Sequence, residues 1–200
     1  MDNIVKQAMA KWPNVPHCYG WLALDARGNW RMRDERAQAL QLVGDRINSP
    51  ALVGFINRNY MADTQGRWYF QNGPQRVYVN LEATPYIART DPAHGFVLHT
   101  GEQLTSIEAA WLTETGQLLL KSGEKVALVD DRDMAQCLPL LQIAGTVAND
   151  NQILAWLSQP DASPALTLEY AGRQYPIKPI LRAAIAPQFG FILAPQADAS

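Results

Sequence analysis

The sequence has little cysteine, no surplus of positive charge and no zinc-binding motif, and each shortage excludes a class of protein. Its 200 residues include two cysteines, Cys18 and Cys137, which are far apart and have no CxxC neighbour. Together with three scattered histidines they predict neither a disulfide framework nor a zinc site. Seventeen basic residues against nineteen acidic ones give a net charge of −2. Because affinity for nucleic acid depends on neutralising phosphates, we expect no nucleic-acid partner.

Long hydrophobic runs and catalytic motifs are also absent. No stretch approaches the ~20 consecutive apolar residues that cross a bilayer, and the first twelve residues lack the apolar core of a signal peptide. We therefore predict a cytoplasmic protein without a membrane partner. The chain has no phosphate loop, nucleophile elbow, HExxH motif or calcium loop. We accordingly expect no cofactor and no enzyme class that such motifs identify.

What the chain does contain is balanced charge with six Trp, seven Tyr and five Phe, which is typical of a folded domain with its own core. In the first half, hydrophobic periodicity and turn residues predict alternating helices and hairpins. A Ser49-Pro50 pair gives one helix a capped start, since the Ser oxygen accepts free N–H groups and proline loses a donor that had no partner. The predicted elements are a helix at 2–11, a hairpin turning at 25–28, a weak helix at 34–46, a helix at 50–61 and a hairpin at 67–82.

The second half repeats this order after a segment without sustained periodicity. Carboxylates at 130–133 precede an apolar stretch and favour a helix start, with Pro139 bending the helix. The predicted elements are a connection within 84–105, a meander of strands from 110 to 129, a helix after 133, a helical segment near 153–157, a hairpin at 166–177 and a loose tail at 194–200.

The order of hairpin, helix and hairpin thus occurs twice, and the first hairpins share a Trp-Leu start at Trp21 and Trp111 before a turn glycine. Two similar modules explain this most simply, while coincidence between two common hairpin patterns stays open. The predicted fold class is α+β, with two similar modules, each of antiparallel β-hairpins packed against a helix. The predicted domains are 1–90, a connection at 91–105, a second module at 106–193 and the tail at 194–200.

Four segments carry a family resemblance: Gly28-Asn29-Trp30, 49–53, Gly66–Phe70 and 75–86. In order and spacing they resemble uncharacterised proteobacterial families of unknown function, which pair a DG-aromatic hairpin with a second hairpin ending in a Glu and a Pro-aromatic pair. The resemblance implies an α+β fold of repeated motifs, a bacterial cytoplasmic protein and a role in ligand sensing or signalling. It brings no catalytic residue, and this chain departs from the pattern at 34–46 and at 71–73.

Polar side chains gather near the end of the predicted helix at 50–61 and in the hairpin that follows. Two guanidinium groups, several amides and phenols in one neighbourhood suit a carboxylate or phosphate. The predicted ligand-binding residues are Arg58, Asn59, Tyr60, Gln71, Asn72, Gln75, Arg76 and Tyr78. They predict a non-catalytic module that binds a small anion or a protein partner, with a possible signalling role. The alternative is structural: Arg58 caps the helix, Tyr60 packs and 71–76 is a solvated turn.

Two further functions stay open. Asp130, Asp131 and Asp133 supply oxygen ligands for a divalent cation, and so a metal-assisted hydrolase is the alternative function. The structural explanation of the same residues is helix capping, with Arg132 as the local counter-ion. A structural role is the third possibility, because an exposed hairpin edge has unpaired backbone groups that bind another chain.

Overall fold

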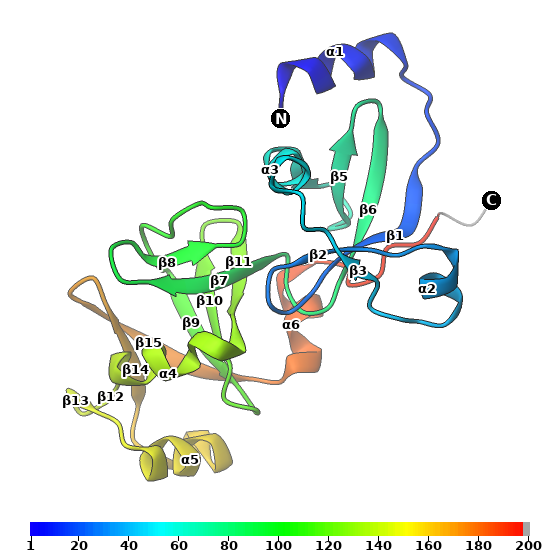
Figure 1. Cartoon of the computed structure of the whole chain (residues 1–200). Coiled ribbons are helices and arrows are strands. Elements are labelled where there is room, and N and C mark those ends of the chain that lie inside the picture. Colours follow the sequence, from blue (N-terminus) through cyan, green and yellow to red (C-terminus); the bar gives the residue numbers. More distant parts are fainter. Residues whose placement is uncertain (198–200) are drawn as a thin grey trace. The chain divides into compact units, whose positions relative to one another are not determined.

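A computed structural model describes residues 1–197, and the chain forms two compact units (Figure 1). Unit 1 consists of Met1–Pro85 together with Ala186 and the residues after it, and unit 2 of Tyr86–Ile185. Both combine helices with largely antiparallel sheet, which confirms the α+β class. The unit boundary differs from the predicted connection at 91–105, since that segment contains a strand of unit 2. Residues 194–197 are neither helix nor strand, and the rest of the expected tail lies outside the described residues.

Unit 1 is built on a six-stranded sheet in the order β3-β2-β1-β6-β5-β4. All neighbours are antiparallel except β1 and β6, which run parallel with Leu24 beside Leu81. That parallel pair joins the two hairpins β1–β2 and β5–β6. The elements are α1 (Asn3–Lys11), β1 (Cys18–Leu24), β2 (Trp30–Met32), α2 (Glu35–Ala39), β3 (Asp45–Arg46), α3 (Pro50–Arg58), β4 (Tyr60–Ala62), β5 (Trp68–Asn72) and β6 (Gln75–Leu81).

Local sequence explains the start of α3. The Ser49 hydroxyl accepts the Leu52 N–H at 3.4 Å and Pro50 occupies the first helical position, which confirms the predicted cap. The weak helix predicted at 34–46 is only the five residues of α2. Gln41 and Gly44 then adopt positive φ angles of 52° and 84°, and a left-handed backbone cannot continue a right-handed helix. The chain leaves the helix there and forms β3.

One face of the unit 1 sheet packs against α3 through aromatic side chains. The rings of Phe55 and Phe70 meet edge-on at 5.4 Å, and Trp30 meets Tyr60 at 5.0 Å. The Trp30 indole N–H donates to Asn57 Oδ1 at 2.7 Å. Buried aromatics of this kind combine large apolar area with a satisfied polar atom, so they fix both the position and the rotation of α3.

Unit 2 is built on a nine-stranded sheet in the order β13-β12-β14-β15-β9-β10-β11-β7-β8. Its core is the central hairpin β10–β11, where Leu118, Leu119, Leu120 and Leu128 are fully buried. The predicted hairpins at 110–129 and 166–177 are present. The strands are β7 (Tyr86–Asp91), β8 (Gly95–Leu98), β9 (Ala109–Thr113), β10 (Leu118–Ser122), β11 (Lys125–Val129), β12 (Leu141–Ile143), β13 (Thr146–Val147), β14 (Leu166–Tyr170) and β15 (Arg173–Ile180).

The helices of unit 2 are short. The helix expected after Asp133 is divided into η1 (Asp131–Asp133), α4 (Met134–Cys137) and η2 (Leu138–Leu140), with Pro139 in the last segment. Helix α5 (Asp150–Ser158) begins with a capping box between Asn149 and Gln152. A further element of unit 2 is η3 (Pro160–Ala162), and α6 (Arg182–Phe189) begins in unit 2 and ends in unit 1. No helix among residues 1–197 is long and apolar enough to cross a membrane.

The same turn occurs three times in the two units. In each copy the backbone N–H of the first residue donates to the carbonyl of the residue four positions later. The backbone N–H of the turn glycine donates to the carbonyl of the first residue. The first residue's side-chain oxygen accepts the N–H four positions on, at 2.8–3.0 Å. The first residues are Asp25, Asp63 and Thr113, and the glycines are Gly28, Gly66 and Gly116, with φ of 76°, 75° and 80°.

Strand pairing is also similar in the two units. In unit 1 the first strand of one hairpin, β1, lies parallel to the last strand of the other, β6, and in unit 2 the corresponding strands β9 and β15 do so. Aligning the turn glycines matches Thr113 with Asp25 and Trp111 with Ala23. The alignment of Trp21 with Trp111 was therefore two residues out of register, while a common origin of the units stays a prediction.

The two thiols differ in accessibility, which predicts a difference in reactivity. Cys18 is half-buried and Cys137 is fully buried. Burial, and then the charge of Asp133, raise the pKa of the Cys137 thiol to about 12. At about pH 8 we expect one thiol to react quickly with a disulfide reagent and Cys137 to react only on unfolding, because the thiolate is the reactive form. Mass spectrometry of the labelled protein measures this, and Cys18→Ser should abolish the fast phase.

Candidate binding site

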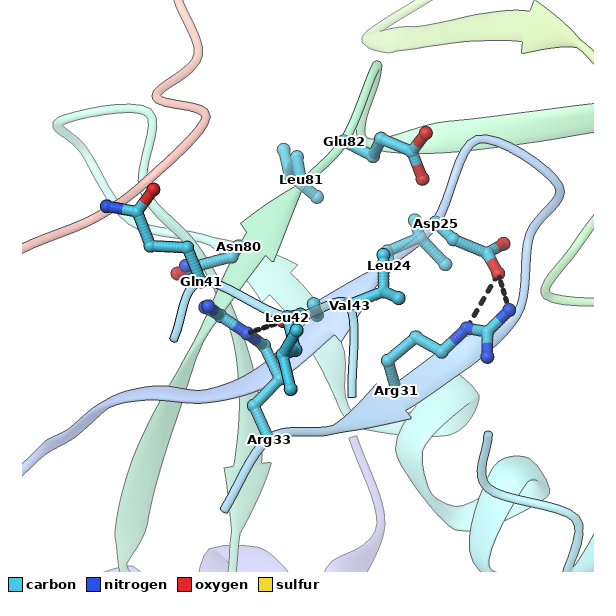
Figure 2. A pocket seen from close by; sticks show the side chains of 11 residues that line it. Leu24, Asp25, Arg31, Arg33, Gln41, Leu42, Val43, Asn80, Leu81 and Glu82 are labelled. Atoms are coloured by element: carbon cyan, nitrogen blue, oxygen red, sulfur yellow. Dashed lines mark hydrogen bonds and ion pairs between the residues drawn. The ribbon is translucent and has the colours of Figure 1, made fainter. Parts of the chain in front are cut away.

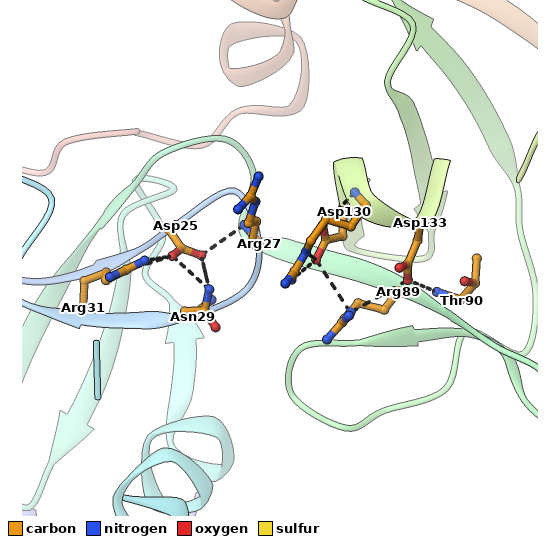
Figure 3. A network of polar contacts seen from close by, with 9 residues as sticks. Asp25, Arg27, Asn29, Arg31, Arg89, Thr90, Asp130 and Asp133 are labelled. Carbon is orange, nitrogen blue, oxygen red and sulfur yellow. Dashed lines mark hydrogen bonds and ion pairs between the residues drawn. The ribbon is translucent and has the colours of Figure 1, made fainter. Parts of the chain in front are cut away.

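Asp25 organises the end of strand β1. Its carboxylate accepts the backbone N–H groups of Arg27 at 3.0 Å and Asn29 at 2.8 Å, and the Arg31 Nε at 2.8 Å (Figure 3). Burial opposes ionisation of this side chain, but the hydrogen bonds from Asn29, Arg31 and Arg27 outweigh it and lower the pKa of Asp25. The carboxylate is therefore ionised at neutral pH and holds the Arg31 guanidinium in place.

A hollow of about 180 Å³ lies beside this carboxylate, where the ends of β1 and β6 run next to each other (Figure 2). Ala23 pairs with Asn80 across the parallel strands, and its short side chain leaves room beside the Asn80 amide. The lining residues are Ala23, Leu24, Asp25, Arg31, Arg33, Gln41, Leu42, Val43, Asn80, Leu81 and Glu82. All of them belong to unit 1.

The polar groups of this hollow are incompletely satisfied. Asn80 Oδ1 is buried and accepts no hydrogen bond within residues 1–197. The Arg33 guanidinium donates through Nε to the Leu42 carbonyl at 3.1 Å, which leaves its two terminal nitrogens for another acceptor. An unpaired buried carbonyl costs on the order of 1–3 kcal/mol, but less than 1 Å² of this oxygen is accessible, so the Arg33 nitrogens are the polar groups left for a ligand.

Apolar side chains form part of the wall. Leu24 and Leu81 are only 1% and 4% exposed and form the inner side of the hollow. Leu42 and Val43 are 46% and 66% exposed. Small-molecule sites typically combine an apolar wall with a few fixed polar groups. This hollow has that composition.

The eight residues predicted from the sequence lie elsewhere. Arg58 is exposed and pairs with the carboxylate of Asp2 at 3.2 Å. Asn59 is buried, accepts the Asp2 N–H at 2.8 Å and donates to the Phe55 carbonyl at 2.9 Å. The buried Tyr60 donates its hydroxyl to the Pro85 carbonyl at 2.9 Å. Arg58 and Asn59 therefore attach the start of α1 to the end of α3, whereas the structural alternative had Arg58 as a helix cap. Tyr60 packs, as that alternative predicted.

The hairpin residues form a second group. Gln71 is buried and donates to the Gly73 carbonyl at 2.9 Å, while its Oε1 has no partner within residues 1–197. Asn72 pairs with Gln75 at the turn, and Gln75 donates to the Pro16 carbonyl at 3.0 Å. Pairing across β5 and β6 places Gln71 opposite Arg76 and Asn72 opposite Gln75. The Gln71 N–H also donates to the Asn59 carbonyl at 2.9 Å, so the hairpin lies beside the end of α3, where the Arg58 and Tyr60 side chains have other partners.

Arg76 and Tyr78 take part in an aromatic cluster on the sheet. The Arg76 guanidinium lies 4.6 Å from the ring centre of Tyr69, and Tyr78 is fully buried. The Tyr78 hydroxyl donates to Asp63 at 3.1 Å. None of the eight predicted residues lines the hollow described above. A ligand at these residues stays a prediction.

The acidic cluster of unit 2 is engaged by arginines and backbone groups. Asp130 is fully buried and accepts the Arg132 backbone N–H and Nε, both at 3.0 Å (Figure 3). Burial opposes ionisation, but the side-chain and backbone bonds of Arg132 outweigh it and lower the pKa of Asp130. Asp133 accepts the Thr90 N–H at 2.8 Å. This confirms capping with Arg132 as counter-ion and does not favour the metal-assisted hydrolase.

No group of three or more His, Cys, Asp or Glu side chains within residues 1–197 is arranged to hold a metal ion. The hollow was missed from the sequence because its residues come from four separate segments. Arg33, Asn80 and Glu82 are isolated polar residues at strand ends and form no motif. The parallel pairing of β1 with β6 assembles the hollow, and local sequence does not reveal that pairing.

The fold and the hollow together define an α+β protein of two units with a candidate small-molecule site in the first. Residues 1–196 match the family model DUF2944, described as "Protein of unknown function (DUF2946)". The chain belongs to this family. The expectation of an uncharacterised family is thereby confirmed, whereas the proteobacterial origin stays a prediction.

Two crystal structures of DUF1285 family proteins are similar to the chain. The protein from Silicibacter pomeroyi DSS-3 shares 15% identity at a TM-score of 0.49, covering 88% of this chain and 94% of that one. The protein from Shewanella baltica OS155 shares 11% identity at a TM-score of 0.39, covering 56% and 85%. No curated protein matches the sequence.

Proposed function

We propose that the chain is a non-catalytic binding module that holds a small molecule in the hollow between the ends of β1 and β6. The observation that carries the proposal is the Arg33 guanidinium, which lines the hollow and bonds through Nε alone, to the Leu42 carbonyl. A guanidinium with free terminal nitrogens binds carboxylate or phosphate oxygens through paired hydrogen bonds. The ligand therefore carries an anionic group for Arg33.

Binding rather than catalysis is supported by the residue types present. The lining residues include no Ser, Thr, Cys, His, Lys or Tyr, so the hollow contains none of the common nucleophiles except carboxylates. Asp25 has a lowered pKa and accepts several hydrogen bonds. A carboxylate in that condition is a weak base, because general bases work best with a pKa near the working pH.

The signalling role is part of the same proposal. Leu42 and Val43 border the hollow and are exposed, and the Leu42 carbonyl accepts from Arg33. A ligand that binds Arg33 therefore also acts on the segment that carries two exposed apolar side chains. Exposed apolar side chains of this kind are suited to contact a protein partner.

The test is a nuclear magnetic resonance titration of the full chain with acetate, inorganic phosphate and sulfate. We expect amide shifts at 31–33, 41–43 and 80–82, and their loss in Arg33→Gln. Arg46→Gln, a change of the same kind on the exposed strand β3 outside the hollow, should leave the shifts intact. Shifts confined to 58–60 and 71–78 would instead support the residues predicted from the sequence, and no response at either place would contradict both sites.

A further inference from the structure

The hollow of unit 1 has an unpaired charge of each sign. Arg31 and Asp25 form an ion pair at 2.8 Å and neutralise each other. Arg33 bonds only to the Leu42 carbonyl, and Glu82 accepts only the Ala26 N–H at 2.9 Å through Oε2. Neither has an ion-pair partner within residues 1–197. One guanidinium and one carboxylate are thus left to face a ligand.

These two charges lie at different ends of the hollow. The Arg33 N–H donates to the Trp21 carbonyl, and the Glu82 N–H donates to the Leu24 carbonyl. Their backbones are therefore offset along β1 by the stretch from Trp21 to Leu24, about 10 Å at a rise of about 3.3 Å per residue. Because β2 and β6 flank β1 on opposite sides, two strand spacings of about 4.8 Å each also separate them across the sheet. Figure 2 shows Arg33 beside Gln41 and Asn80, and Glu82 apart from them.

The size of the hollow limits what can lie between the charges. A volume of about 180 Å³ corresponds to roughly six water molecules at about 30 Å³ each. It is smaller than the roughly 300–1,000 Å³ of sites for drug-sized ligands. Leu24 and Leu81 form the inner wall between the two ends. The space therefore suits a short molecule with an apolar middle.

We propose that the ligand of this hollow is a small zwitterion of amino-acid size, with its anionic end on Arg33 and its cationic end on Glu82. The proposal rests on the proposed function and names the chemical class of the ligand. A ligand with only an anionic group leaves the exposed Glu82 carboxylate to water and the Ala26 N–H. A ligand with both charges satisfies both side chains, and charge complementarity of this kind confers specificity.

The test uses linear amino acids whose two charges are separated by increasing lengths of chain. The probes are β-alanine, γ-aminobutyrate, δ-aminovalerate and ε-aminocaproate, with valerate and pentylamine as singly charged controls. Dissociation constants are measured by nuclear magnetic resonance titration of the full chain. We expect at least one amino acid to bind ten-fold or more tightly than valerate or pentylamine, with an optimum chain length within the series.

Charge variants then assign each end. Arg33→Gln should weaken binding of the best amino acid and of valerate at least ten-fold. Glu82→Gln should reduce the affinity for the best amino acid to the affinity for valerate. The affinity for valerate itself should not change. Arg46→Gln and Glu35→Gln, both exposed and outside the hollow, should change neither. Glu82→Lys should bind glutarate more tightly than the wild type does, a gain that loss of folding cannot produce.

The outcomes separate this inference from the proposed function. If valerate binds through Arg33 as tightly as every amino acid, and Glu82→Gln has no effect, the zwitterion is wrong and the anion site stands. If Arg33→Gln has no effect on any anion, both proposals fail. If the amino acids bind tightly but independently of both side chains, the hollow is not their site and this inference is also overturned.

Discussion

Replacing Asp63 with asparagine should destabilise unit 1 by about 3 kcal/mol, the lower part of the range measured when one partner of a buried ion pair is removed. The carboxylate and the Arg67 guanidinium are 9% and 12% exposed and lie 2.8 Å apart. The carboxylate also accepts the N–H groups of Gln65 and Arg67 and the Tyr78 hydroxyl. Asparagine keeps the shape but removes the negative charge that faces the Arg67 guanidinium at 2.8 Å.

The effect should depend on pH in a defined direction. Burial alone would raise the pKa of Asp63, but the bonds from Arg67, Gln65 and Tyr78 outweigh it and hold the pKa below the ordinary value of 3.8. A carboxyl whose pKa is lower in the folded state contributes its full stability above the unfolded pKa. It loses that contribution as the pH falls through the folded value. The difference between wild type and Asp63→Asn should therefore be constant near neutrality and shrink below pH 3.8.

Hydrogen exchange measured by mass spectrometry in urea would monitor this, because peptides of unit 1 report its unfolding separately from unit 2. Asp45→Asn, at an exposed position on β3, is the control and should change stability by less than about 0.5 kcal/mol. Equal stability of wild type and Asp63→Asn at neutral pH would contradict the role of the carboxylate. A difference that persists undiminished at pH 2 would contradict the pKa argument.

Gly66→Ala should also destabilise unit 1 strongly, because the substitution adds both a conformational cost and a steric cost at one position. Gly66 has φ of +75°, and a Cβ there would lie 2.0 Å from the Gly190 carbonyl oxygen. A left-handed alanine costs roughly 1–2 kcal/mol, and displacing packed backbone costs typically about 1–3 kcal/mol more. The Ile192 N–H also donates to the Gly66 carbonyl at 3.0 Å. We expect the segment after Gly190 to separate from the turn.

Gly116→Ala is the matched control for this prediction. Gly116 occupies the same position of the same turn with φ of +80°, but its added Cβ would meet only Leu157 Cδ1 at an ordinary 3.7 Å. It should therefore show the conformational cost alone. We expect the amides after Gly190 to exchange faster in Gly66→Ala and not in Gly116→Ala. The difference measures the contribution of the close contact between Gly66 and the Gly190 carbonyl. Equal costs for the two variants, with no change after Gly190, would mean that the contact stabilises nothing.

Much of the local structure could be predicted from the sequence. The Ser49-Pro50 cap, the turn glycines Gly28 and Gly116 and the alternation in β6 depend on neighbours within a few residues, and all of these elements are present. The weak helix at 34–46 was wrong beyond Ala39, since the positive φ at Gln41 has no signal in the residue type. The predicted connection at 91–105 contains strand β8, which forms a hairpin with β7, and the division between the units falls at Tyr86.

The candidate site could not be predicted in the same way. Arg58, Asn59 and Tyr60 are adjacent in the sequence, yet their side chains bond to Asp2, Phe55 and Pro85 respectively. Arg58 and Asn59 meet at Asp2 while Tyr60 bonds elsewhere, so closeness in sequence gave residues that bond within the chain. Asn80 and Arg33, by contrast, become neighbours of one hollow only after β1 pairs with β6.

By itself, the sequence determined the α+β class, most of the helices and hairpins, and the membership of a family without known function. These depend on periodicity, caps and turn chemistry, which act over a few residues. Only the tertiary structure decided the division into units, the parallel pairing of β1 with β6 and the hollow with its unpaired Arg33, Asn80 and Glu82. Those features depend on contacts between distant segments, and whether a polar group finds a partner is settled only when the chain has packed.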